Sequence, residues 1–333
     1  GLQTVALENP PVIIGKAAVA GPMEAQGPLG KEYDLTYPDL ILGQQSFEKA
    51  ERTMVQDACR LALQSAGIKG MPPEIDYFLA GDLLNQIISS TFSALPLGVP
   101  FFGLYGACST LCESLSLGAM LIDGGYADKV LCATASHNCT AERQYRYPTE
   151  YGGQRKPYAQ WTVTGSGALV VAAQGTGPRI THVTTGRVMD YGIPDPFNQG
   201  AAMAPAAVHT IAAHFSDTGR TADYYDLIVT GDLARFGQEM ALRLAGEQKL
   251  GLTYENYKDC GVLVFDNTTQ DVHSGGSGCG CSAIVTCGHL LKEMARGKLG
   301  KLLLVATGAL LSPTTFQQGE NIPAIAHAVA IEV

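Results

Sequence analysis

Two short, mostly apolar stretches recur along the chain with the same ending. Residues 75–83 read as a short buried strand that closes on Gly-Asp-Leu, and residues 225–233 repeat this arrangement. Each is preceded by apolar residues at three- and four-residue steps, the spacing of an amphipathic helix. Gly67 and Gly219 follow these two periodic stretches and predict where the helices end.

The repetition continues beyond the strands. Residues 106–136 can be laid on residues 279–309 without gaps, which sets Cys108 opposite Cys281 and Ser109 opposite Ser282. Each half then reads helix, strand, crossover, helix, strand, a pattern typical of parallel strands covered by helices. We therefore predict an α/β protein built from two pseudo-symmetric halves, residues 1–175 and 176–333.

One segment has no counterpart in the second half. Residues 136–160 are rich in polar and aromatic side chains and interrupt the repeat. Because inserted loops often carry function on a rigid scaffold, we expect this loop to lie near a functional site.

Composition narrows the class of protein. The 333 residues are 46% hydrophobic and 16% charged, with a formal net charge of −9, so a nucleic-acid partner is not expected. No apolar run approaches the roughly 20 residues of a membrane-spanning helix. We expect a soluble chain, cytoplasmic or held at a membrane through partner proteins.

The nine cysteines form no CxxC pair and are expected to be reduced.

Cys108 is the first candidate for chemistry. Residues 101–105 read as a strand and residues 109–122 as a helix, so Cys108 lies at a strand-to-helix junction. Amides at the start of a helix favour a thiolate and are expected to lower the thiol pKa. The alternative is a small buried apolar side chain, the commoner role of a lone cysteine.

A glycine-rich turn opens the corresponding helix of the second half. Residues 275–282, which include Ser277, can present backbone amides to an anion, or can simply be a tight connection between helix ends. We expect no metal at Cys279 and Cys281, because further ligands of a tetrahedral site are not evident nearby.

The inserted loop offers positive charge in an acidic protein. It begins at His137 and Asn138 and contains Arg143 and Arg146 among several tyrosines. Guanidinium groups bind carboxylates in bidentate fashion, so this cluster is a candidate clamp for a planar carboxylate. A solvated loop or a dimer contact is the alternative.

Polar side chains also follow the two repeated strands. Asp82 and Asp232 lie where ligands of α/β sheets tend to bind, although both could equally be helix N-caps. Asn85 and Gln86 follow the first of them. His327, before the last predicted strand, either faces Cys108 or satisfies a buried hydrogen bond.

The duplicated halves, the turn around Cys108, the late glycine turn and residues 164–168 together resemble thiolases and ketoacyl synthases over the whole chain. This resemblance implies a thiolase-like five-layer αβαβα fold, a homodimer, and Cys108 at the nucleophile position.

Longer strings at residues 80–86, 136–154 and 306–313 resemble the stage V sporulation protein AD family. That resemblance implies binding of dipicolinic acid (pyridine-2,6-dicarboxylic acid) or its calcium chelate for uptake into the developing spore. It also implies transport proteins of the spore membrane as partners, and no cofactor.

The catalytic pattern of the superfamily is incomplete in this sequence. The histidine that such enzymes place after the second repeated strand is replaced by Gly231 or Asp232, and the late asparagine and terminal Cys-x-Gly motif are missing near 274–277 and 324–326. We therefore expect a non-catalytic binding protein. The predicted ligand-binding residues are Cys108, Ser109, Asn85, Gln86, His137, Asn138, Arg143, Arg146, Ser277 and His327. The alternatives are an acyl-thioester condensing enzyme that uses Cys108 and an adaptor with a vestigial pocket.

Overall fold

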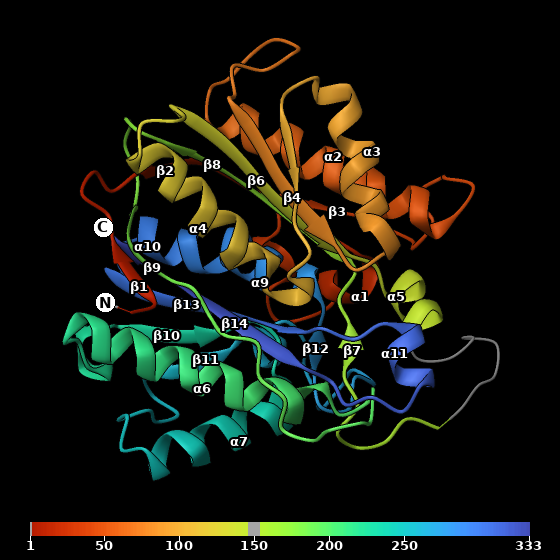
Figure 1. The fold of residues 1–333 in the computed structure, drawn as a ribbon. Helices are drawn as coiled ribbons and strands as arrows, with labels where there is room; N and C mark the ends of the chain where they lie inside the picture. Colours follow the sequence, from red (N-terminus) through yellow and green to blue (C-terminus); the bar gives the residue numbers. More distant parts are fainter. Residues whose placement is uncertain (1, 146–153) are drawn as a thin grey trace.

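The first half of the molecule is built on five strands of one twisted sheet. The computed structural model describes residues 2–145 and 154–333 (Figure 1). The strands are β2 (Val12–Ala20), β4 (Tyr77–Asp82), β5 (Phe101–Gly103), β6 (Lys129–Ser136) and β8 (Gly165–Ala172). They lie side by side in the order β2-β8-β6-β4-β5.

The second half repeats this arrangement. Its strands are β9 (Arg179–Thr184), β10 (Leu227–Thr230), β11 (Tyr257–Asp259), β13 (Lys301–Ala309) and β14 (Ala324–Glu332). They follow the order β9-β14-β13-β10-β11, so each strand occupies the place of its counterpart in the first half. The halves meet where Val12 of β2 pairs with Arg179 of β9. The short strands β1 (Thr4–Ala6), β3 (Leu35–Thr36), β7 (Trp161–Thr162) and β12 (Gly276–Ser277) pair outside this path.

The prediction of parallel pairing is only partly correct. In each half the three strands farthest from the junction are parallel, β5-β4-β6 and β11-β10-β13. The strands β8 and β14 run antiparallel to both of their neighbours. The physical reason is that β6 and β13 are followed by chain that returns to the sheet without a crossover helix, and such a return reverses the strand direction.

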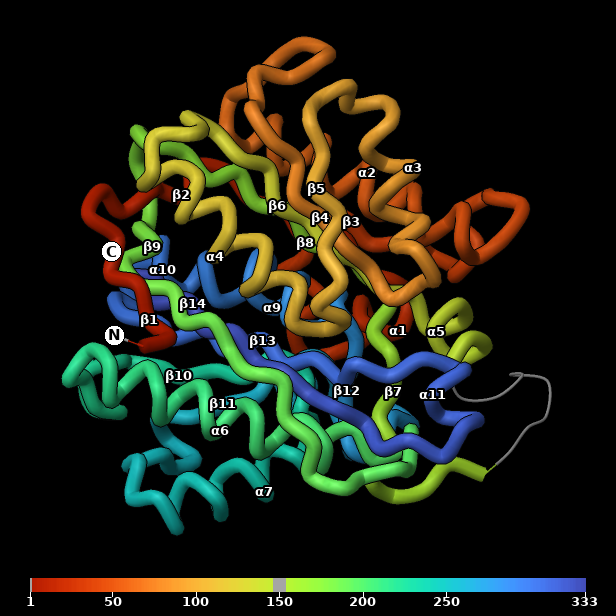
Figure 2. Tube along the Cα trace, in the orientation of Figure 1, coloured from red at the N-terminus to blue at the C-terminus, as the bar shows by residue number. Residues whose placement is uncertain are grey.

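Helices complete a five-layer arrangement (Figures 1 and 2). The outer layers are α2 (Phe47–Ser65) with α3 (Ile88–Leu97), and α6 (Gln199–Thr218) with α7 (Ala234–Glu247). The central layer is α4 (Thr110–Asp123) with α9 (Cys279–Val285) and α10 (Leu291–Ala295), the latter two joined by a π-helical turn. The short helices are α1 (Pro22–Ala25), α5 (Asn138–Tyr145), α8 (Cys260–Leu263) and α11 (Pro313–Gln317). The predicted five-layer αβαβα fold is confirmed.

Helix α2 shows how the sequence dictates the outer layer. Ser46 caps its first turn by accepting a hydrogen bond from the Lys49 amide. Its apolar stripe, including Met54 and Ala58, is buried against the sheet. The chain leaves the helix through Gly67, whose φ of +72° suits glycine. The second-half helix α6 likewise ends at Gly219 in the left-handed conformation, as the spacing predicted.

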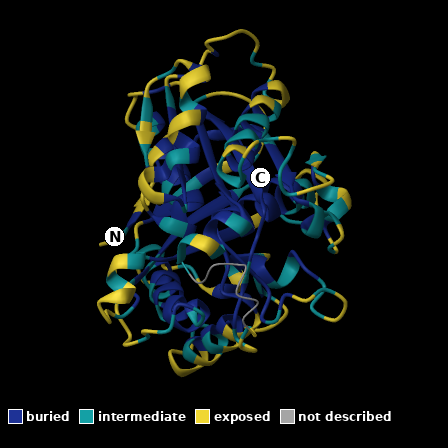
Figure 3. Cartoon of the chain, turned by 90° about the vertical axis from the view of Figure 1, so that its right-hand side faces the viewer, coloured by how far each residue is buried: buried dark blue, intermediate teal, exposed yellow. Residues whose placement is uncertain are grey.

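Burial follows the layers. The strands and the central helices are buried, whereas exposed residues gather on loops and on the outward faces of outer helices (Figure 3). Within the described residues, none of the helices combines the length and apolar character that crossing a membrane requires.

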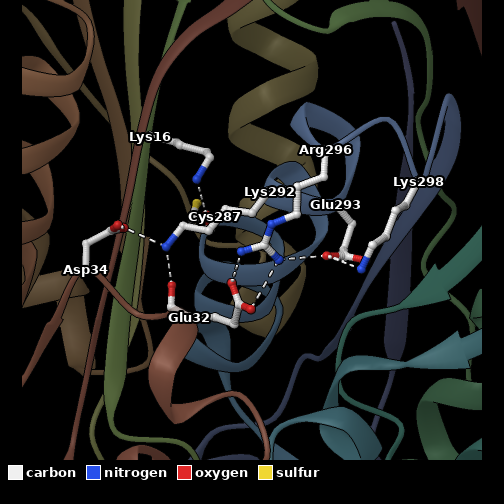
Figure 4. Close-up of polar contacts among 8 residues, drawn as sticks. All are labelled: Lys16, Glu32, Asp34, Cys287, Lys292, Glu293, Arg296 and Lys298. Carbon is white, nitrogen blue, oxygen red and sulfur yellow. Dashed lines mark hydrogen bonds and ion pairs between the residues drawn. The ribbon is translucent and has the colours of Figure 1, made fainter.

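A charged network also connects the two halves (Figure 4). Lys16 of β2 donates to the Cys287 carbonyl oxygen at 2.8 Å, and Lys292 of α10 lies 3.2 Å from Asp34. Arg296 bridges Glu32 of the first half and Glu293 of the second. Most of these side chains are partly exposed, and exposed ion pairs add little to stability. We therefore infer that the network mainly orients the two halves.

Candidate functional site

The turn that carries Cys108 is sharply bent. Residues 107–109 form a 3-10 turn between β5 and α4, and Ala107 has a φ of +49°, which side chains rarely adopt. The Ser109 hydroxyl donates a hydrogen bond to the Gly106 carbonyl oxygen at 2.6 Å, which stabilises the turn. The strand β13 packs directly against it, since a Cβ on Gly308 would lie 2.4 Å from the Gly106 oxygen. The fold therefore holds Cys108 in one position.

A cavity of about 350 Å³ opens above this turn. The described residues that line it are Asp82, Leu83, Leu84, Asn85, Gln86, Ile87, Tyr105, Ala107, Cys108, Ala141, Tyr145, Thr162, Gln199, Ser277, Ala309, Leu310, Leu311, Ser312 and Thr315. They come from both halves, so the cavity lies between them. Asp82 is the one carboxyl in this set, and the remaining side chains are neutral amides, hydroxyls, a thiol and apolar groups.

The thiol of Cys108 has unusual neighbours. Its sulfur lies close to the side chains of Cys279 and Asp232. The contact with Cys279, burial and the nearby Asp232 carboxyl together raise the pKa of Cys108 well above its ordinary value. Cys279 in turn donates to the Ala107 carbonyl oxygen at 3.0 Å. The prediction that helix amides lower this pKa is therefore wrong, and the thiol is uncharged at neutral pH.

Asp232 lies where the resemblance implied a histidine. One carboxyl oxygen accepts from Thr307 at 2.6 Å and the other from the Gly278 amide at 2.9 Å. Asp232 is not the N-cap of α7; Asp259 accepts from the first amides of that segment, including Ala234 at 2.8 Å. Burial raises the pKa of Asp232, and the hydrogen bonds from Thr307 and Gly278 oppose this shift.

Asp82 is not the N-cap residue of a helix; instead its carboxyl group holds the loop after β4. It accepts from the Leu84 amide at 2.9 Å and from both the amide and the hydroxyl of Ser90 at 2.7 Å. These bonds shape the loop between β4 and α3, in which Gln86 and Ile87 have positive φ angles. The loop places Asn85 and Gln86 at the wall of the cavity.

The structure brings some predicted residues together and places others elsewhere. Cys108, Asn85, Gln86 and Ser277 line the cavity. The Ser109 hydroxyl is used within the turn. Arg143 forms an ion pair with Glu48 beside a separate depression. Arg146 lies outside the described residues.

The predicted histidines and Asn138 are not among the described lining residues, and their side chains make hydrogen bonds with the backbone. The Nε2 of His137 donates to the Leu40 carbonyl oxygen at 2.8 Å. Asn138 donates its side chain to the Thr162 carbonyl oxygen at 3.3 Å. The Nδ1 of His327 accepts from the Gly186 amide at 3.2 Å, and burial lowers the pKa of His327 to about 4.

Sequence reasoning missed several residues of the cavity wall. Gln199, at the start of α6, and Thr315, in α11, belong to no motif, and Ser312 lies in the string 306–313 but was not predicted to bind a ligand. The available signal was that residues 310–315 follow β13, the strand equivalent to β6, which precedes the inserted loop.

Comparison with solved structures defines the class. OleA of Xanthomonas campestris with bound cerulenin aligns with a TM-score of 0.62 at 14% identity, over 98% of this chain and 100% of that one. The 3-oxoacyl-[acyl-carrier-protein] synthase III of Aquifex aeolicus VF5 aligns with a TM-score of 0.56 at 14% identity, over 97% and 100%. At such identity the likeness shows the fold alone: this is a thiolase-like α/β protein.

Sequence comparison then gives the family. The family model for stage V sporulation protein AD matches residues 1–332. Stage V sporulation protein AD of Bacillus subtilis (strain 168) is 48% identical over 332 residues, which cover 100% of this chain and 97% of that protein. The chain belongs to the stage V sporulation protein AD family.

Proposed function

We propose that this protein is a non-catalytic binder of dipicolinic acid, held as its calcium chelate in the cavity beside Cys108. The binding would serve uptake of the compound into the developing spore, alongside transport proteins of the spore membrane. The observation that carries the proposal is the position of Cys108 beside Cys279 and Asp232, at the wall of a cavity lined by both polar and apolar side chains.

The environment of Cys108 supports binding over catalysis. A nucleophilic cysteine must become a thiolate, and enzymes achieve this with an adjacent base or positive charge. Here the contacts of Cys108 are a second thiol and a carboxyl group, both of which favour the protonated form. The bent turn of a condensing enzyme is retained. In place of a base or a positive charge that would form the thiolate, however, Cys108 has neighbours that keep its sulfur protonated.

The lining supports the chelate as the bound form. A free dicarboxylate carries two negative charges, and burying them beside neutral groups and Asp82 is costly. The calcium chelate has no net charge. The amides of Asn85 and Gln86 and the hydroxyls of Ser277 and Thr315 can hydrogen-bond its oxygens, and apolar residues can pack on the ring. The volume falls within the roughly 300–1,000 Å³ of small-molecule sites.

Isothermal titration calorimetry tests the proposal. The protein is titrated with pyridine-2,6-dicarboxylate in excess calcium and, separately, in a calcium-free buffer with a chelator. Benzene-1,3-dicarboxylate is the matched control, since it has the same carboxylates but no ring nitrogen to chelate the ion. We expect saturable binding with calcium, markedly weaker binding without it, and none of the control ligand. No binding at millimolar ligand in either buffer would contradict the proposal.

A further inference from the structure

The cavity wall includes one end of a long helix. Helix α6 is 20 residues long and begins at Gln199, which lines the cavity. No side chain caps this end of the helix. The first amides of an α-helix have no partner within it, and the helix dipole adds partial positive charge at the same end. This end therefore offers hydrogen-bond donors to a negatively charged group.

The side chain of Gln199 is a second and independent indication of a ligand. Gln199 is only 7% exposed, and its side-chain amide has no hydrogen-bond partner among the described residues. Because Gln199 lines the cavity, this amide is open to the cavity and free to hydrogen-bond a molecule bound there.

Close packing fixes this helix end near Cys108. A Cβ on Gly200 would lie 2.6 Å from the Leu233 carbonyl oxygen and 3.2 Å from the Gly237 amide nitrogen. The first turn of α6 thus packs on the segment that follows Asp232. Asp232 accepts a hydrogen bond from Ser277 at 3.3 Å and lies beside Cys108, so Gln199 and the thiol belong to one region of the cavity.

We propose that the amino-terminal end of α6 and the Gln199 amide form a carboxylate subsite of this cavity. The inference rests on the proposed function and deepens it: one carboxylate of the chelated ligand accepts hydrogen bonds from the Gln199 Nε2 and from free amides of the first turn. Asp82 does not compete for these donors, because its oxygens are already bonded to Leu84 and Ser90.

Two substitutions test the subsite by calorimetry in calcium-containing buffer. Gln199→Glu places a negative charge where the helix dipole favours it, so the melting temperature should be kept while the charge repels the ligand. We expect at least a tenfold loss of affinity for calcium pyridine-2,6-dicarboxylate. Gln199→Leu keeps the size and removes the donor, and we expect a loss of several-fold. Gln64→Glu, which adds the same charge on an exposed turn of α2, is the matched control and should bind as the native protein does.

A second ligand separates the carboxylate contact from general damage to the cavity. In 6-carbamoylpyridine-2-carboxylate one carboxylate is replaced by an amide, so the native protein should bind it less tightly. In Gln199→Leu the difference in affinity between the two ligands should be smaller than in the native protein. If the native protein binds the dicarboxylate and both variants match it, the subsite is contradicted and the proposed function stands. If the native protein does not bind, the proposed function itself fails.

Discussion

Cys108 illustrates how much the chemistry of one residue depends on side chains distant in sequence. Its turn has the strained Ala107 conformation of a nucleophile elbow, and a helix begins directly after it. Amides at that helix start would favour a thiolate. Burial and the contacts with Cys279 and Asp232 outweigh them and raise the pKa of Cys108. The result is an uncharged, polarisable group at the cavity wall.

Removing the second thiol should make Cys108 more reactive. In Cys279→Ala the contact that contributes most to the raised pKa is lost, so the thiolate fraction at pH 8 should increase. We expect iodoacetamide to modify Cys108 several-fold faster, measured by mass spectrometry of the Cys108 peptide. Cys287→Ala is the matched control, because it removes a buried thiol from the turn between α9 and α10. It should leave the modification rate of Cys108 unchanged. Equal rates in all three proteins would contradict this account of the thiol.

The predicted site residues divide according to where their partners lie in the sequence. Asn85, Gln86 and Ser277 were identified because they follow a strand end or open a helix, and such positions face the sheet edge. His137, Arg143 and His327 instead contact Leu40, Glu48 and Gly186. Those partners come from segments that nothing in the local pattern connects to the histidines or the arginine, so their placement was not predictable from sequence.

At the scale of elements, the turn at Cys108 depends on the strand behind it. The duplicated pattern predicted the helix-strand-helix-strand unit of each half and the stops at Gly67 and Gly219, since each arises from local periodicity and backbone conformation. It could not reveal that β13 of the second half approaches the turn of the first at Gly308. That contact joins residues about 200 positions apart in the chain, and it requires only that residue 308 has no side chain.

A methyl group at this contact should displace the turn. In Gly308→Ala the added Cβ would lie 2.4 Å from the Gly106 oxygen, and backbone on both sides leaves little room to adjust. We expect the free energy of unfolding to fall by about 1–3 kcal/mol, with weaker ligand binding, as measured by chemical denaturation and calorimetry. Gly246→Ala is the control: it lies in α7 with open space around its Cβ and should stabilise by about 0.5–1 kcal/mol. Similar effects of the two changes would contradict the role of Gly308.

At the scale of the whole molecule, the duplicated halves create the cavity by meeting around the central helices. The equivalence of the two halves follows from the repeat, and the five layers follow from the resemblance. The strand order and the junction at β2 and β9 were not predicted, because they depend on long-range pairing. The expected homodimer stays a prediction, because a single chain is described. The edge strand β5, with Phe102 half exposed, is the surface where we expect a second copy to pair.

The account is tested most directly by a crystal structure of the protein grown with calcium and pyridine-2,6-dicarboxylate. We predict electron density for a planar ring and a calcium ion in the cavity, with one carboxylate at the start of α6 and the Cys108 sulfur unmodified. An empty cavity with the ligand bound elsewhere, or a covalent adduct on that sulfur, would contradict it.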